Sequence, residues 1–384
     1  MKHKHRNRWI ALLIAIIMML TAGISVLAEE LTAQTAEATG ETSAKAYEIK
    51  GAEVVKADEG PYYKNYVSIG DSCGSGLGLP QYVALSKERN MRWLPCEKIE
   101  GSYPTLVAKA VGATEFGQYH FPGARTADIR YLLDEHYYAD WVLLGQAMYL
   151  SNGIVSKANL DSYRDEVIAA IRNADLITID VGINDVWLPV VAAVYDIAEK
   201  GRILERQLTI PELVAEYGSV ATVVDNAASF VRAWSNPLTW PGNILKLTSA
   251  LTKWVIDYQV NTTAIMNRIR QLNPKATVVV CGLYNPVYHW DLIPFSGDHF
   301  FQHVLQPYYS ALNLKKVADA LFYWGDARYA PMDDIELFSD GFAIPLFEFT
   351  IEDGGNIGYN PHPTLEGAKQ QAKNILNALG VPLG

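Results

Sequence analysis

A serine on a tight turn is the residue of this sequence that is best placed for covalent chemistry. Ser72 lies in the run Gly70-Asp71-Ser72-Cys73-Gly74, directly after the strand-forming residues Tyr66–Gly70. A strand that stops at such a turn holds a hydroxyl at the open end of a sheet, and small neighbours let a substrate carbonyl come close. The pattern therefore predicts a nucleophilic serine that hydrolyses or transfers an acyl group.

Acyl transfer also needs a general base, and His362 is the histidine best suited to that role. Pro363 follows it just before a predicted helix, so that its orientation can be fixed. The base would accept the Ser72 proton and later donate it to the leaving group. The remaining histidines of the mature chain have no matching motif and are interpreted as surface or structural residues: His120, His136, His289, His299 and His303.

Two folds present a serine in this manner, and position along the chain separates them. Gly70-Asp71-Ser72-Cys73-Gly74 also fits the G-x-S-x-G elbow of α/β-hydrolases, in which several strands precede the serine. Only one credible strand precedes Ser72, so a flavodoxin-like sheet with the nucleophile after its first strand is favoured.

Four separate blocks, in order, resemble the SGNH (GDSL) hydrolase superfamily. They are Gly70-Asp71-Ser72, Gly123 within 121–129 (Phe-Pro-Gly-Ala-Arg-Thr-Ala-Asp-Ile), Gly182-Ile183-Asn184-Asp185, and His362-Pro363 with Gly367. Each block alone is common, but all four in this order are specific. The resemblance runs from about Tyr66 to the C-terminus.

The resemblance implies a flavodoxin-like three-layer α/β/α sandwich with a central parallel sheet. It also implies that Ser72 and His362 act as nucleophile and base, with the Ser72 and Gly123 N–H groups and the Asn184 amide as oxyanion donors. A turn-stabilising role is the alternative for Asn184, and Asp185 is expected to organise its loop. The implied activity is that of an esterase or lipase forming an acyl-serine intermediate. The alternatives are a carbohydrate O-acetyl esterase and a non-catalytic secreted binding module on the same scaffold.

The sequence departs from the family at one position. Family members carry Asp three residues before the histidine, where this chain has Tyr359. Asp353 or Glu352 would then orient His362 from upstream, or a backbone carbonyl would do so in a Ser–His dyad. Impairment of the site is the third and least favoured interpretation, because every other block is intact.

Predicted strands and helices alternate along the chain, which is the pattern expected for a parallel sheet. Near-continuous apolar strands separated by helices are typical of a parallel sheet covered on both faces. The predicted strands are Tyr66–Gly70, Gln118–Phe121, Leu176–Val181, Ala276–Leu283 and, more weakly, Asp334–Phe338. The predicted helices are Tyr103–Ala113, Thr126–Leu133, Leu160–Asn173, Gln302–Phe322 and Thr364–Leu379.

A long helical excursion at about 186–272 separates the strands at 176 and 276. Its predicted helices are Val190–Lys200, Ile210–Tyr217, Val220–Ser235 and Ile244–Leu272. A crossover needs far fewer residues, so the excess is either a cap over the site or additional helical packing. Its apolar character favours lipid-like acyl esters over small acetyl groups.

The N-terminal residues predict export. Residues 1–28 combine a basic start, an apolar run at Trp9–Leu20 and the small-residue cleavage site Val26-Leu27-Ala28, which is typical of a secretory signal peptide. An uncleaved membrane-anchoring helix is the alternative. Residues 29–60 are expected to form a flexible leader, and residues 61–384 the hydrolase domain.

Net charge, cysteine content and metal-binding motifs limit the classes of ligand and partner that the sequence predicts. The chain carries 32 Lys and Arg against 42 Asp and Glu, a net charge of −10, and removal of the four-charge signal leaves −10 − 4 = −14. An acidic surface argues against nucleic acid and anionic lipid. Cys73 and Cys96 would either pair or remain free, and Cys281 reads as a buried apolar residue. No metal or cofactor motif is found: the His299/His303 pair lacks the glutamate of an H-E-x-x-H site.

Overall fold

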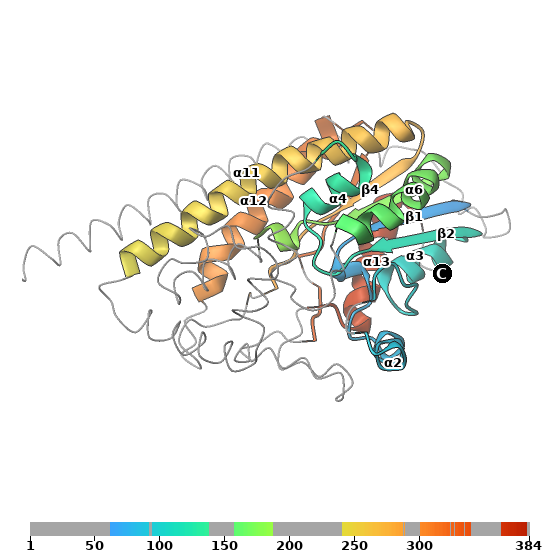
Figure 1. The fold of residues 1–384 in the computed structure, drawn as a ribbon, viewed down its shortest axis with the longest axis horizontal. Coiled ribbons are helices and arrows are strands. Elements are labelled where there is room, and N and C mark those ends of the chain that lie inside the picture. Colours follow the sequence, from blue (N-terminus) through green and yellow to red (C-terminus); the bar gives the residue numbers. More distant parts are fainter. Residues whose placement is uncertain are drawn as a thin grey trace, which may run out of the picture.

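The centre of the molecule is a five-stranded parallel sheet, shown in Figure 1. The computed structural model describes residues 62–91, 94–137, 157–186, 240–286, 288, 300–322, 324–325, 327–333, 335–338 and 362–381. The strands are β1 (Asn65–Gly70), β2 (Glu115–His120), β3 (Leu176–Asp180), β4 (Thr277–Cys281) and β5 (Ala327–Ala330). They lie in the order β2-β1-β3-β4-β5, and every neighbouring pair is parallel. This is the flavodoxin-like order, so the predicted α/β class with a central parallel sheet is confirmed.

Helices cover both faces of this sheet. They are α2 (Pro80–Arg89), α3 (Tyr103–Val111), α4 (Thr126–Leu133), α6 (Lys157–Asn173), α11 (Trp240–Leu272), α12 (Phe300–Phe322) and α13 (Leu365–Leu379). Successive strand residues point to opposite faces. Tyr66 of β1 therefore packs in the core that α3 and α13 share, and its neighbour Val67 packs in the core that α4 and α6 share. Figure 1 shows these two helix layers on either side of the sheet. Two buried faces explain why the strands are predominantly apolar rather than alternating.

The helix that follows His362 begins and ends at well-defined caps. The Thr364 hydroxyl accepts a hydrogen bond from the Gly367 N–H at 3.1 Å, which satisfies one of the first free amides of α13. The helix ends at Gly380 in the left-handed conformation, with φ of 69°. The start of α13, and with it the segment carrying His362, is therefore locally defined.

The last strand is the one that sequence reasoning placed wrongly. The sheet includes β5 at Ala327–Ala330, and 335–338, the described part of the predicted strand Asp334–Phe338, is not a strand of the sheet. Leu337 instead forms an isolated antiparallel bridge with Pro363. The reason is physical: β5 is a short edge strand, Ala-Arg-Tyr-Ala, and Ala330 is its one buried residue, so it carries little hydrophobic signal.

The C-terminal end of the 186–272 excursion is core packing. Ile265, Met266 and Ile269 of α11 are buried in the core beside α4 and α6. This end of α11 therefore serves as the crossover helix between β3 and β4, while its other end extends well beyond the sheet (Figure 1). The helices predicted at 190–200, 210–217 and 220–235 lie outside the described residues.

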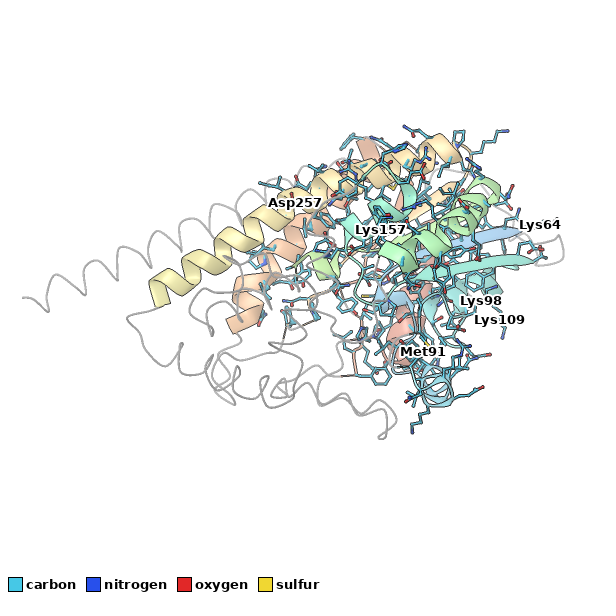
Figure 2. All side chains as sticks on the ribbon, viewed as in Figure 1. Lys64, Met91, Lys98, Lys109, Lys157 and Asp257 are labelled. Atoms are coloured by element: carbon cyan, nitrogen blue, oxygen red, sulfur yellow. The ribbon has the colours of Figure 1, made fainter. Side chains whose placement is uncertain are left out.

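The predictions for the N-terminal segments and the cysteines can be compared with the structure only in part. The signal peptide and the leader lie outside the described residues. Among the described residues, no helix combines the length and apolar character that crossing a membrane requires. Cys73, Cys96 and Cys281 are free thiols in this structure, and Cys281 is fully buried as predicted. Figure 2 shows the described side chains on the ribbon, with Lys157 and Asp257 over the α6 and α11 layer.

Candidate active site

Ser72 opens a single 3-10 turn, Ser72–Gly74, at the carboxyl end of β1. The turn is capped by Asp71, whose Oδ1 accepts a hydrogen bond from the Cys73 N–H at 2.9 Å. The Ser72 carbonyl in turn accepts from the N–H and the hydroxyl of Ser75, at 3.1 and 2.8 Å. Within the described ranges the Ser72 hydroxyl makes no hydrogen bond, and the residue is 7% exposed. The backbone is thus held while the hydroxyl is left available.

Glycine is required immediately before the turn. A Cβ on Gly70 would lie 2.1 Å from the Asp180 carbonyl oxygen and 2.8 Å from Cε1 of His120. The Asp180 carbonyl belongs to backbone of β3 and cannot move aside, because it accepts the Asp71 N–H at 2.9 Å. Gly70 therefore permits the close approach of β3 on which the turn depends.

Gly70→Ala is accordingly expected to destabilise the protein by about 3 kcal/mol or more, the upper end of the range for overpacking a core, because the obstructing atom belongs to the backbone. Urea unfolding followed by circular dichroism measures the change. The control is Gly325→Ala, where a Cβ meets nothing within 4 Å and only the left-handed φ of 64° is unfavourable, a cost of about 1–2 kcal/mol. Equal destabilisation by the two substitutions contradicts the packing argument.

The second sequence block forms the loop after β2. The Phe121 N–H donates to the Gly70 carbonyl at 2.9 Å, which places this loop directly beside the serine turn. Gly123 adopts a φ of 88°, a conformation that favours glycine. The Ala124 N–H bonds back to the Phe121 carbonyl at 2.9 Å and closes the loop. Gly123 is thus held at the same edge of the sheet as Ser72.

The third block, after β3, is tied to the second. The Asn184 amide donates to the Ala124 carbonyl at 2.9 Å, and the Asp185 carboxylate accepts the Thr126 N–H at 2.8 Å. Asp185 also accepts from the Thr126 hydroxyl. The prediction that Asp185 organises its loop is confirmed. Because β2 and β3 flank β1, the sheet brings Ser72, Gly123 and Asn184 together at the carboxyl edge, where ligands bind in open α/β sheets.

The His362 segment is held against the residues that follow β5. The Phe338 N–H donates to the His362 carbonyl, and the Thr364 N–H donates to the Glu336 carbonyl, both at 3.0 Å. A Cβ on Gly367 would lie 2.0 Å from that Glu336 carbonyl, so glycine allows α13 to start this close. The fourth sequence block is therefore a backbone clamp as well as the carrier of a histidine.

His362 lies on the side of the molecule where α3 and α13 begin. A Cβ on Gly101, just before α3, would lie 2.9 Å from Cδ1 of Leu365. The ring of His362 is buried, and burial lowers the pKa of this imidazole to about 3, so that it is neutral near pH 7. Asp353 and Glu352, the acids predicted to orient His362, lie outside the described residues, and so does Tyr359, which takes the place of the family's aspartate.

Cys73 is not an alternative nucleophile. Its side chain is buried, and burial raises the pKa of the thiol well above its ordinary value. The Tyr284 hydroxyl donates to Sγ at 3.2 Å. A thiol held protonated in this manner is inert, because the thiolate is the reactive form.

A buried cluster of ionisable side chains near the turn was not predicted from the sequence. Asp71 and Asp180 each have one carboxylate oxygen without a hydrogen-bond partner among the described residues. Lys316 of α12 is also buried, and its ammonium donates to the carbonyls of Cys281 at 2.6 Å and Val181 at 3.3 Å. Burial raises the pKa of Asp71 to about 6 and that of Asp180 well above its ordinary value, and it lowers the pKa of Lys316. An acid at the end of the apolar run Leu-Ile-Thr-Ile-Asp was the sequence signal for this cluster.

These acids also form the one group of possible metal ligands within the described residues. Single ligand atoms of Asp71, Cys73 and Asp180 lie within 4.8 Å of one another. The Lys316 ammonium already supplies positive charge to both carboxyl groups and partly offsets the rise in their pKa values that burial causes. The raised pKa of the thiol further disfavours metal binding, which requires a thiolate.

No protein-family model and no curated protein matches this chain. Solved structures that it resembles include an extracellular lipase from Streptomyces rimosus, with 18% identity, a TM-score of 0.42, and coverage of 82% of this chain and 99% of that one. Phospholipase A1 from Streptomyces albidoflavus gives 18% identity, a TM-score of 0.39 and coverage of 82% and 98%. A carbohydrate esterase family 2 enzyme with a carbohydrate-binding domain, from Corynascus thermopiles, is 15% identical, with a TM-score of 0.35. The match covers 85% of this chain and 69% of that one. TM-scores below 0.5 do not establish a shared fold, so the assignment of a function rests on the residues of this chain.

Proposed function

We propose that this chain is a serine hydrolase of SGNH type that cleaves carboxylic esters through an acyl intermediate on Ser72. The observation that supports it best is the meeting of three sequence blocks at one sheet edge. Ser72 follows the central strand β1, and Gly123 and Asn184 follow its two neighbours, with Asn184 hydrogen-bonded to the Gly123 loop. A nucleophile flanked by potential oxyanion donors is what acyl transfer needs.

The proposed mechanism uses His362 as the base. Neutral His362 takes the Ser72 proton as Oγ attacks the ester carbonyl, and the carbonyl electron pair moves to the oxygen. The N–H groups of Ser72 and Gly123 and the Asn184 amide stabilise that oxyanion. The intermediate collapses, the C–O bond to the alcohol breaks, and His362 protonates the departing alkoxide. A water molecule, deprotonated by His362, then releases the acid and restores Ser72.

The proposed substrates are esters of apolar acyl chains, met outside the cell. The predicted signal peptide supports export, and the apolar helical excursion supports a lipid-like acyl group. An acetyl esterase acting on carbohydrate is the second candidate. The solved structures that this chain resembles are named for both kinds of activity, a lipase and phospholipase A1 on one side and a carbohydrate esterase on the other.

A series of p-nitrophenyl esters tests both the activity and the preference. We expect kcat/KM for the octanoate to exceed that for the acetate, because each methylene that leaves water contributes about 0.8 kcal/mol of binding. Ser72→Ala supplies the background rate for every ester. Preference for the acetate contradicts the acyl-chain proposal and leaves the esterase proposal standing, whereas no hydrolysis of any ester contradicts both.

The loss of kcat/KM at low pH is expected to occur at a lower pH than for a histidine base of ordinary pKa. Protonation of His362 removes the base, and burial lowers its pKa to about 3. The base therefore remains neutral as the pH falls through the ordinary histidine value near 6.5, and activity is expected to persist to about pH 5. Product is measured by chromatography, with circular dichroism at each pH to confirm that the protein stays folded. Loss of activity with a midpoint near 6.5 contradicts this environment for His362.

A further inference from the structure

A buried chain of hydrogen bonds runs across the sheet and ends on the peptide that carries the Ser72 N–H. The Tyr66 hydroxyl lies 2.9 Å from Oγ1 of Thr178, which donates to Oγ of Ser68 at 2.8 Å. Ser68 Oγ lies 2.8 Å from Nε2 of His120. Nδ1 of His120 lies 2.9 Å from the carbonyl oxygen of Asp71, the residue before Ser72. Each of these five residues is at most 1% exposed, so water does not compete with these bonds.

The last bond gives the chain a direction. A carbonyl oxygen only accepts, so Nδ1 of His120 carries the proton. Burial lowers the pKa of His120 to about 4, so the ring is neutral and Nε2 is an acceptor. Ser68 therefore donates to Nε2 and accepts from Thr178, which accepts from Tyr66. Every proton in the chain points toward the Asp71 carbonyl.

The imidazole is also held in place by packing. A Cβ on Gly74 would lie 2.2 Å from Cε1 of His120, so the ring fills the space that this glycine leaves. The Tyr103 ring meets it edge to face, with centroids 5.8 Å apart. Under these contacts the Nδ1–H is aimed at the Asp71 carbonyl without freedom to turn away.

We propose that His120 is a positioning residue, which orients and polarises the Asp71–Ser72 peptide so that the Ser72 N–H binds the oxyanion. This rests on the proposed ester hydrolysis. Ser72 is the first residue of its turn, where the N–H has no acceptor within the turn, and among the described residues it donates no backbone hydrogen bond, so it is available to a ligand. A hydrogen bond to the carbonyl of a peptide strengthens its N–H as a donor, since bonds in a chain polarise one another. His120 acts on the reaction through this peptide, without contact with the substrate.

Kinetics of two variants test this role. His120→Ala is expected to lower kcat by about 10- to 100-fold with KM changed less than about twofold, since only transition-state binding is lost. His120→Asn keeps an N–H close to the place of Nδ1 and is expected to recover most of that loss. The matched control is His136→Asn, a substitution of an exposed histidine that is expected to leave kcat unchanged.

Inhibition separates positioning from loss of fold. A trifluoromethyl ketone forms a tetrahedral adduct whose oxyanion uses the same donor, so its Ki is expected to rise with the fall in kcat/KM across His120→Ala, His120→Asn and Ser68→Ala. A merely structural role reduces the fraction of active sites, counted with a fluorophosphonate, and leaves Ki unchanged. An unchanged Ki in the folded His120→Ala protein overturns the proposal.

A nuclear magnetic resonance measurement reads the contact itself, independently of activity. Labelling Asp at the carbonyl carbon and Ser at nitrogen selects Asp–Ser peptides, of which this sequence has two, Asp71–Ser72 and Asp161–Ser162. In His120→Ala the Ser72 amide proton is expected to move upfield while Ser162, in α6, stays in place as an internal control. A stationary Ser72 signal contradicts the hydrogen bond. An inactive but folded wild type contradicts the proposed function instead, which keeps the two failures distinct.

Discussion

Replacing Ser72 with alanine is expected to lower kcat/KM for ester hydrolysis by roughly 10⁴- to 10⁶-fold. The hydroxyl is the group that attacks the carbonyl, and Cys73 beside it is a buried thiol with a raised pKa that cannot substitute. Only the oxyanion donors and the binding site then remain, and together they retain a small fraction of the rate. The measurement is the steady-state rate with p-nitrophenyl octanoate over the uncatalysed background.

The control for this substitution is Ser162→Ala. Ser162 lies on the exposed side of α6, and within the part of the chain that the structure describes its hydroxyl bonds only to the Asn159 carbonyl, at 2.6 Å. We expect full activity from that variant. Loss of the hydroxyl of Ser72 is a small change in a turn that is held by backbone bonds, so the melting temperature should stay close to that of the wild type. Activity retained in Ser72→Ala contradicts the assignment of the nucleophile.

His362→Ala is expected to produce a loss of similar size, roughly 10⁴- to 10⁶-fold. Without the base the Ser72 hydroxyl keeps its proton, and the leaving alcohol has no donor. The substitution also opens a space for a small base, so imidazole added to the buffer is expected to restore part of the activity in proportion to its concentration. The readout is kcat/KM as a function of imidazole.

Two comparisons make the His362 result specific. His136→Ala removes a histidine whose side chain is 89% exposed, and it is expected to be fully active. Ser72→Ala is not expected to respond to imidazole, because it lacks the group that the base activates. Full activity of His362→Ala, or a response to imidazole in both variants, contradicts the role of His362 as base.

The strands that position the site were predictable from their chemistry. Leu176–Val181 and Ala276–Leu283 are nearly continuous apolar runs, which is the signature of strands buried on both faces, and β3 and β4 lie within them. The edge strands carry weaker signals. β2 begins at Glu115, and its first residues are more exposed than its last, so the prediction found only its inner end.

The wrong placement of the last strand has the same cause. The segment near Leu337 contains apolar residues, but they meet Pro363 and the start of α13 instead of the sheet. This segment holds the His362 segment through a backbone bridge between Leu337 and Pro363. A bridge between residues far apart in the chain produces no periodic pattern of apolar residues in the sequence. Sequence periodicity reports burial of a face, and it does not report pairing between distant loops.

The buried polar contacts near the serine turn could not be predicted from the sequence, for a related reason. His120 lacks a motif and was interpreted as surface or structural. The structure places it fully buried, between Ser68 of its neighbouring strand and the Asp71 carbonyl. Asp180 and Lys316 come from elements more than a hundred residues apart. The contacts between buried polar groups depend on strand register and on helix packing. The local spacing of residues in the sequence predicts neither.

Covalent labelling by a fluorophosphonate directly tests whether Ser72 is an activated nucleophile. The reagent transfers a phosphonyl group to an activated serine and releases fluoride, so it requires nucleophile, base and oxyanion donors together. We expect one phosphonyl group per folded chain, located on Ser72 by mass spectrometry of the peptide that contains it, and no label in Ser72→Ala or His362→Ala. A folded wild-type protein that takes up no label, or carries it on another serine, contradicts the role of Ser72 as the nucleophile.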